Sequence, residues 1–248
     1  MAAAPPLLHE GCEDFWSWSA NDKSHEVKLQ GARNETAVFH PNWSNGTAGV
    51  RGTRVLNRGR FYWELKLSHR VFGTSMMFGI GTRRTRLHVD EFVNMLGEND
   101  QSWGLSHKGL LWHGGTSRPF TDPFPEKQPT TLGLLFDGIK GTLTYYKDGV
   151  CLGEAFTGLN RYTSELYPFV CSTAAKTEMT LTNMRRGMVS LEDRCCVTIA
   201  THLRSEKEAG GLLLPAILRS NIARECSRQS QNNDPLTHLK SSCGVTWT

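Results

Sequence analysis

The residue types that could support catalysis or hold a metal are scattered along this chain. Nine histidines occur, but no H-E-x-x-H motif sets any of them at the spacing of metal ligands. Cys195-Cys196 with His202 would need a second cluster to bind zinc, and none of the seven cysteines forms a C-x-x-C pair. The sequence therefore predicts no metal and no other cofactor.

Other patterns typical of enzymes have simpler explanations. Gly79-Ile80-Gly81 lacks the third glycine and the following helix of a phosphate-binding loop. There is no P-loop and no G-x-S-x-G motif. Asp137 and Asp148 each precede a glycine, where aspartate is favoured for backbone reasons. Turn formation accounts for both carboxylates and leaves acid–base catalysis as the weaker alternative, so we expect a binding protein rather than an enzyme.

Composition limits the architecture and the partners. A chain of 248 residues with 38% hydrophobic and 21% charged residues can form one large domain, or one medium domain plus an appendage. The net charge is +4, and the longest basic runs are pairs such as Arg83-Arg84 and Arg185-Arg186. Nucleic-acid-binding proteins gather their basic residues into a stripe, so we expect no nucleic acid as partner.

The lack of targeting signals and the spacing of the cysteines favour a reducing compartment. Residues 1–11 lack the charged and apolar regions of a signal peptide, and no apolar run of about 18 residues predicts a membrane span. An odd number of cysteines without paired spacing fits reduced thiols in the cytoplasm or nucleus. The sequons at Asn34, Asn42 and Asn45 then serve as turn residues.

Hydrophobic periodicity predicts many short strands between Trp16 and Thr182. Residues 61–67 alternate between apolar and polar types, which indicates a half-buried strand. Residues 76–80 form a nearly continuous apolar run, which indicates a strand buried on both faces. Asp148-Gly149 between apolar runs predicts a hairpin. Further strands are expected at 131–136, 141–147, 150–152, 166–171 and 178–182. Without long amphipathic helices between them, these strands predict a mainly β fold, an antiparallel β-sandwich over residues 14–184.

The pattern becomes helical after Gly187. Ser190 can cap a helix in which Leu191, Cys195, Ile199 and Leu203 recur every four residues. A second helix is expected to begin near Pro215. We therefore expect a small α-helical unit over residues 188–228, with flexible segments at 1–13 and 229–248.

Ordered landmarks along the sandwich resemble a known family. The stretches 51–53, 61–64, 78–81, 100–105, 141–143 and 166–168 are similar to the landmarks of a SPRY domain. The stretch 170–175, followed by Ser190-Leu191 and Cys195, resembles the SPRY domain-containing SOCS box family. The resemblance covers residues 14–226 and implies a SPRY-type sandwich followed by a helical SOCS box.

The resemblance assigns partners to the helical unit. It implies that Leu191, Cys195 and Ile199 bind the elongin B–elongin C pair, with Leu191 inserted into a pocket of elongin C. It also implies that Leu214, Pro215 and Leu218 contact a cullin-5-type scaffold with its RING partner. The family motif has Leu-Pro-x-Pro character, and Leu213 departs from it, which weakens the choice of cullin.

The resemblance also places a target-binding surface on the sandwich loops. It implies a site formed by Arg51, Gly73, Thr74, Phe92, Met95, Thr173 and Ala174. Relatives carry tyrosine, leucine and tryptophan where this chain has Phe92, Met95 and Ala174, and they bind short asparagine-rich peptides. We expect a target protein with a short linear motif, with asparagine as a candidate residue in it. The alternative for Arg51 is a structural ion pair.

Two functions follow from these expectations. The first is a non-catalytic adaptor of an elongin–cullin–SOCS box ubiquitin ligase, which binds targets and directs their ubiquitination and proteasomal degradation. The second is a stand-alone SPRY module that binds proteins or glycans, with Trp103 or Trp112 as a stacking surface. The two differ in whether Leu191, Cys195 and Ile199 face a partner or the protein's own core.

Overall fold

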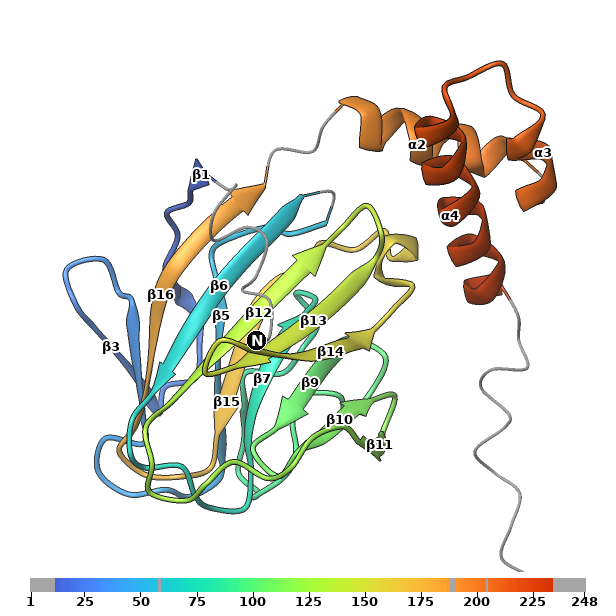
Figure 1. Cartoon of the computed structure of the whole chain (residues 1–248). Coiled ribbons are helices and arrows are strands. Elements are labelled where there is room, and N and C mark those ends of the chain that lie inside the picture. Colours follow the sequence, from blue (N-terminus) through green and yellow to red (C-terminus); the bar gives the residue numbers. More distant parts are fainter. Residues whose placement is uncertain (1–11, 58, 188–190, 204, 234–248) are drawn as a thin grey trace, which may run out of the picture. The chain divides into compact units, whose positions relative to one another are not determined.

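The computed structural model describes residues 12–57, 59–187, 191–203 and 205–233. The chain separates into two compact units, divided between residues 188 and 189. Strands make up the first unit and helices the second (Figure 1). In the described part of the chain, no helix is long and apolar enough to cross a membrane.

The first unit is a sandwich of two antiparallel sheets. One sheet has the order β14-β13-β12-β6-β16-β4-β3, with β1 added beside β16. Its strands are β1 (Cys12–Glu13), β3 (Val27–Gln30), β4 (Thr36–Phe39), β6 (Arg60–Leu67), β12 (Thr130–Asp137), β13 (Thr142–Lys147), β14 (Val150–Phe156) and β16 (Thr177–Gly187).

The second sheet has the order β11-β10-β9-β7-β15-β5-β2, with β8 beside β5. Its strands are β2 (Trp18–Lys23), β5 (Thr47–Gly52), β7 (Met76–Gly81), β8 (His88–Val89), β9 (Ser102–Ser106), β10 (Leu110–His113), β11 (Thr116–Pro119) and β15 (Tyr167–Ser172). Every residue of β5, β7, β9 and β15 is buried. The sandwich predicted from periodicity is therefore confirmed, and so is the strand at Met76–Gly81 that is covered on both faces.

The main core lies between the sheets and is rich in aromatic residues. Trp16 packs edge-on against both Trp18 and Trp63, with ring centroids 5.9 and 6.0 Å apart. Burial of large aromatic side chains supplies much of the hydrophobic stabilisation of a fold. Tyr145 is also fully buried, and its hydroxyl donates a 2.9 Å hydrogen bond to the Phe78 carbonyl across the core.

Two aspartates shape the turns between strands. Asp148 and Gly149 both have positive φ, at 50° and 81°, as the tight turn between β13 and β14 requires. Asp137 Oδ1 accepts hydrogen bonds from two backbone amides of the turn after β12, those of Ile139 and Lys140. Asp148 Oδ1 in turn accepts a 2.9 Å hydrogen bond from the Thr131 amide of β12. Both aspartates thus support the turns, as the sequence predicts.

The sandwich begins earlier than predicted. Cys12 and Glu13 form β1 and pair with Arg186 and Arg185 of β16. The expectation of flexibility over residues 1–13 is therefore wrong for these two residues, because the end of β16 offers them an unpaired edge. Residues 1–11 lie outside the described part of the chain.

The second unit is a small helical cluster with its own core. It comprises α2 (Leu191–His202), α3 (Glu206–Gly210) and α4 (Ala216–Asn233). A short 3-10 helix, η1 (Leu159–Arg161), belongs to the sandwich. The core of the helical unit consists of Cys196, Ala200, Ala209, Ile222 and Cys226. Two helices were predicted, and the polar stretch before Gly211 forms the additional α3.

The last helix extends beyond the predicted boundary at residue 228. Ala216 to Asn233 contains no glycine or proline, so no helix breaker occurs before Pro235. The prediction of a flexible tail is therefore wrong for residues 229–233, and residues 234–248 lie outside the described structure. The predicted cap Ser190 also lies outside it.

Candidate target-binding rim and docking helices

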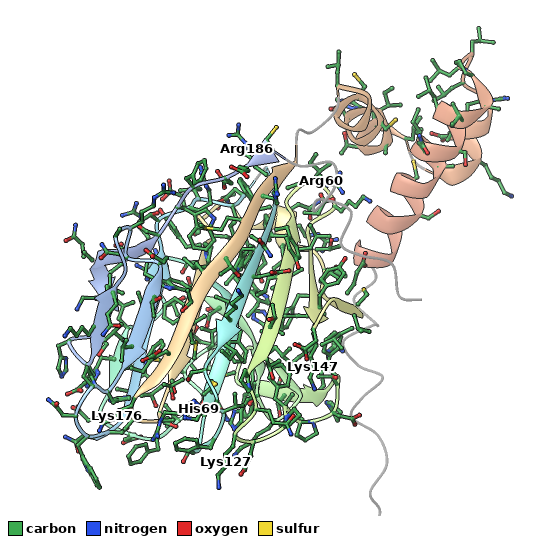
Figure 2. All side chains as sticks on the ribbon, turned by 60° about the vertical axis from the view of Figure 1, so that its left-hand side comes forward. Arg60, His69, Lys127, Lys147, Lys176 and Arg186 are labelled. Carbon is green, nitrogen blue, oxygen red and sulfur yellow. The ribbon has the colours of Figure 1, made fainter. Side chains whose placement is uncertain are left out.

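Four loops gather at one end of the sandwich. They comprise residues 40–46, 68–75, 90–95 and 173–176, and we call them the rim. Strand pairing sets them together, since Thr177 at the start of β16 pairs with Phe39 at the end of β4. Figure 2 shows His69 and Lys176 at this end and Arg60 and Arg186 at the opposite one.

Side-chain hydrogen bonds join three of these loops. Ser44 Oγ donates to the Thr173 carbonyl at 2.6 Å. Thr173 Oγ1 accepts from the Ser75 amide and donates to the Ser75 carbonyl, both at 2.9 Å. Arg70 Nε donates to the Ala175 carbonyl at 2.9 Å. These bonds link residues far apart in the sequence, so the rim is held by tertiary contacts rather than by local turns.

The fourth loop is held at its base by Thr47. Thr47 Oγ1 accepts a hydrogen bond from the Val93 amide at 3.0 Å and donates one to the Glu91 carbonyl at 2.7 Å. The loop is also held through His88, whose Nδ1 lies 2.8 Å from Ser24 Oγ and whose Nε2 lies 3.0 Å from Asp90 Oδ1. Ser24 is buried, so this serine–histidine–aspartate series serves as a tether and presents no accessible nucleophile.

The buried residue His40 fixes the start of the first rim loop, residues 40–46. His40 is fully buried with a left-handed backbone, φ 46°. Its amide donates to the Glu26 carbonyl at 2.7 Å, and its Nε2 lies 3.1 Å from the Ser172 carbonyl. Burial lowers the pKa of His40, which favours the neutral imidazole. A non-glycine residue in this conformation persists only where its surroundings hold it, so the loop starts from a fixed point.

The predicted target-binding residues differ in exposure. Gly73 and Thr74 are exposed, and Phe92 has half of its surface in solvent. Thr173 and Ala174 are buried beneath them, and a Cβ at Gly73 would lie 3.3 Å from the Ala174 Cβ. The structure thus brings Gly73, Thr74, Thr173 and Ala174 together at the rim. Their role in binding stays a prediction.

Met95 lies inside the protein rather than on its surface. It is fully buried in a second, smaller core with Met77, Leu96, Phe169 and Cys171. Glycines on the sheet beneath make room for Met95 and its neighbour Leu96. A Cβ at Gly49 would meet Met95 Cε at 2.7 Å, and Cβ atoms at Gly79 and Gly104 would meet Leu96 Cδ2 at 2.9 and 2.5 Å. Met95 therefore anchors the loop that carries Phe92.

Arg51 is buried and makes internal contacts. Its Nη2 donates to the carbonyls of Arg83 and Thr85 at 3.1 and 3.2 Å, and its Nη1 lies 3.1 Å from Asp22 Oδ1. Only 3% of the side chain is exposed. Burial lowers the pKa of Arg51, and the Asp22 carboxylate opposes this effect. The geometry matches the alternative of a structural ion pair, while a contact with a target stays untested.

Trp43 was missed by the sequence reasoning. It is 76% exposed in the first rim loop, next to the tethered Ser44. Its surroundings hold no periodic pattern, and the only local signals were the sequons at Asn42 and Asn45.

The helical unit has two sets of apolar residues. Cys196 and Ala200 of α2 are buried in its core, whereas Leu191 is 74% exposed and Cys195 is also exposed. Ile199 is half-buried and packs against that core. The predicted stripe is therefore divided: its first two members face away from the core, and Ile199 lies at its edge.

The residues predicted to contact a cullin are similarly divided. Leu214 and Leu218 are half-buried against the helical core, and Pro215 is exposed. The sequence reasoning did not assign contacts to Leu213 and Ile217, yet both are well exposed, Ile217 by 70%. Among the residues that the structure describes, no group of three histidine, cysteine or acidic side chains could hold a metal ion.

Comparison with known proteins identifies the sandwich. The SPRY domain profile matches residues 60–185. The chain belongs to the SPRY domain family. Two solved SPRY structures share its fold: the TRIM65 PSpry domain, with a TM-score of 0.54 and 20% identity over 68% of this chain and 90% of that one, and the SPRY domain of human HERC1, with a TM-score of 0.53 and 15% identity over 67% and 98%.

Relatives with a SPRY domain extend the similarity to the helices. SPRY domain-containing SOCS box protein 3 of Xenopus tropicalis is 35% identical over 92% of this chain and 65% of its own length. That of Xenopus laevis is 37% identical over 74% and 50%. Human SPRY domain-containing SOCS box protein 1 is 28% identical over 88% and 83%. The resemblance inferred from the sequence is confirmed, and this SPRY protein spans half to two thirds of the two Xenopus relatives.

Proposed function

We propose that this SPRY protein is a substrate-recognition adaptor of an elongin–cullin–SOCS box ubiquitin ligase. The sandwich would bind a target through its rim, and the helices would recruit elongin B–elongin C and a cullin-5-type scaffold with its RING partner. The chain itself would be non-catalytic, since ubiquitin transfer would occur on the recruited subunits. The target would then be ubiquitinated and degraded by the proteasome.

One observation carries the proposal. The helical unit already buries a core of its own, yet leaves Leu191 and Cys195 exposed on the same helix. A large exposed aliphatic side chain beside a small exposed thiol is suited to insertion into a groove of a partner. Burying a leucine contributes about 1.5–3 kcal/mol. We assign the elongin contact to Leu191, Cys195 and the exposed edge of Ile199, and the cullin contact to Leu214, Pro215 and Leu218.

Tethering would let a non-catalytic adaptor direct a reaction. Holding the target and the ligase on one chain raises their effective concentration relative to one another. The names of the relatives support this role, and the free cysteines of the described residues, including exposed Cys12 and Cys151, suit the reducing cytoplasm or nucleus.

The test is capture of recombinant elongin B–elongin C by the purified full chain. We expect a stable complex with the full chain and none with a chain ending at Gly187. Leu191→Asp should abolish capture, whereas Thr201→Asp, which adds the same charge to another exposed position of α2, should preserve it.

Two outcomes would contradict the proposal. If the Leu191→Asp variant captured elongin B–elongin C as well as the parent chain does, the assignment of the elongin contact to Leu191 would be refuted. Failure of the full chain to bind elongins would favour the stand-alone binding module instead.

A further inference from the structure

The edge of one sheet is interrupted beside the second half of β16. This strand pairs with β4 as far as Thr180 and with β1 only from Arg185 onwards. Among the described strands, none pairs with this edge at residues 181–184. A hollow of about 450 Å³ lies there, lined by the link between β1 and β2, the turn between β3 and β4, and β16 itself. We call it the edge hollow.

Backbone hydrogen bonds hold both margins of the edge hollow. The Leu181 amide donates to the Glu35 carbonyl at 2.9 Å, and the Asp14 amide donates to the Met184 carbonyl at 3.0 Å. These bonds join segments far apart in the sequence, so the hollow is part of the fold. A ligand could therefore enter it at a small cost in ordering.

The floor and one wall of the hollow are apolar. Trp16 and Leu181 are buried members of the main core, and half-buried Met184 packs against that core. Phe15 forms the wall and is 63% exposed. A concave apolar surface of this size lies within the usual range of ligand pockets, and exposed apolar surface beside it is typical of interaction sites.

Of the two charged side chains that line the hollow, one is held by the turn and the other is available. Glu35 Oε2 accepts a hydrogen bond from the Arg33 amide at 2.9 Å, and its carboxylate fills the space that a Cβ at Gly31 would need. Hydrogen bonds from the backbone amides of Glu35 and Arg33 lower the pKa of this carboxyl. The Arg33 guanidinium instead lies over the Phe15 ring, 5.4 Å from its centroid, and forms no ion pair with the described residues.

The other charged groups nearby leave an excess of positive charge. Asp14 forms an ion pair with Arg54, and Glu13 lies opposite Arg185 in the register of β1 and β16. Arg186 is exposed and lies at the end of the sandwich away from the rim (Figure 2). Together with the guanidinium of the β3–β4 turn, it favours an acidic ligand.

Exposed apolar surface continues beyond the hollow. The link that carries Phe15 is joined to the loop after β5, where the Thr53 amide donates to the Ser17 carbonyl at 2.9 Å. Val55 in that loop is 40% exposed. An elongated surface with one pocket suits an extended peptide segment better than a compact small molecule.

We propose that the edge hollow binds an extended acidic segment of a partner protein. A phenylalanine or leucine side chain of that segment enters the hollow beside Phe15, and the carboxylate of the next residue pairs with Arg33. The site is separate from the rim, and the inference does not depend on the adaptor function.

The probe is a pool of acetylated and amidated 10-residue peptides with a central Phe-Glu pair and randomised flanking positions. The full chain selects binders, and fluorescence anisotropy measures the dissociation constant of the best peptide. Ala32→Trp should weaken binding by at least about 10-fold, because Ala32 is exposed on the turn and an indole there would fill the hollow. Arg33→Gln should weaken binding by about 5-fold at low salt. Arg84→Gln is the matched control, an exposed arginine of the β7–β8 turn, and should change affinity by less than about 2-fold.

A peptide in which glutamine replaces the central glutamate tests the charge contact. The parent chain should bind it about 5-fold more weakly, whereas Arg33→Gln should bind both peptides equally, because its pair is already broken. Hydroxyl-radical labelling then locates the peptide. It should protect Phe15 and Met184 and leave Trp43, which is exposed at the rim, as reactive as before. Urea midpoints equal to that of the parent should show that the variants are folded.

Several results would overturn the inference. Selection of no peptide would do so, and so would affinities that neither Ala32→Trp nor Arg33→Gln changes. Peptide binding only to a chain lacking residues 2–10 would make that segment the occupant, and a dimer of the parent that Ala32→Trp abolishes would make a second copy the occupant. Capture of elongins by the helices would be unaffected by any of these results.

Discussion

Replacing Arg51 with methionine separates a structural role from a role in target binding. Methionine keeps much of the aliphatic stem and removes the guanidinium group. In the folded protein that group donates to the carbonyls of Arg83 and Thr85 and pairs with Asp22. The substitution leaves the Thr85 carbonyl without its donor in a buried site and the Arg83 carbonyl without its donor in a partly buried one.

The expected loss follows from these contacts. Each hydrogen bond from a charged donor contributes about 1.5–3 kcal/mol, so losing two costs about 3–6 kcal/mol. The pair with Asp22 adds little, because that carboxylate is 44% exposed and regains water. Most domains have only about 5–15 kcal/mol of stability, so Arg51→Met should leave the sandwich marginally stable.

Urea unfolding followed by tryptophan fluorescence measures this loss, because every tryptophan that the structure describes lies in the sandwich. With a slope of about 2 kcal/mol per molar urea, the midpoint should fall by about 1.5–3 M. Arg83→Met is the control: the Arg83 side chain is 70% exposed in an ion pair with Glu165, so its midpoint should change by less than about 0.5 M. An unchanged midpoint in Arg51→Met would refute the structural account, and loss of target binding in that folded variant would establish Arg51 as a target contact.

Two further predictions concern pH and packing. Burial lowers the pKa of His40 and His107 in the folded state, so the unfolded chain binds more protons and the free energy of unfolding should fall as the pH drops below about 6.5. Urea midpoints measured at several pH values should show this fall. A His40→Asn/His107→Gln variant whose midpoint depends on pH as strongly as that of the parent would contradict the prediction. Gly79→Ala should destabilise the sandwich by about 3 kcal/mol or more, because its Cβ would lie 1.9 Å from the Trp103 carbonyl oxygen. Gly210→Ala, with nothing within 4 Å of its Cβ, should leave the melting temperature unchanged. Equal melting temperatures for the two variants would refute the packing argument.

Local signals explain what the sequence revealed about the fold. The turn at Asp148-Gly149 was predictable because few residues tolerate positive φ, and the apolar run at Met76–Gly81 reflects burial on both faces. The edge pairing of β1 was not predictable, because it depends on Arg185 and Arg186, far away in the sequence.

The candidate sites were predictable only in part. Residue matching located the rim through Gly73, Phe92 and Ala174, but it placed Met95 on the surface, whereas the glycines beneath let it pack inward. Trp43 gave no signal, since its loop is positioned by the bond between Ser44 and Thr173, 129 residues apart. Periodicity also does not distinguish Cys195 from Cys196, and the structure buries the second.

The glycines beneath the Phe92 loop bear on how such a protein could change its ligand. Met95 and Leu96 hold this loop from below by packing against Gly49, Gly79 and Gly104, so the outward residues contribute little to folding. Random variation at 42–43 and 91–92, with Asp90 and the inward residues kept, should therefore yield many folded variants with new preferences. The rim is in this respect a framework for a synthetic binder library.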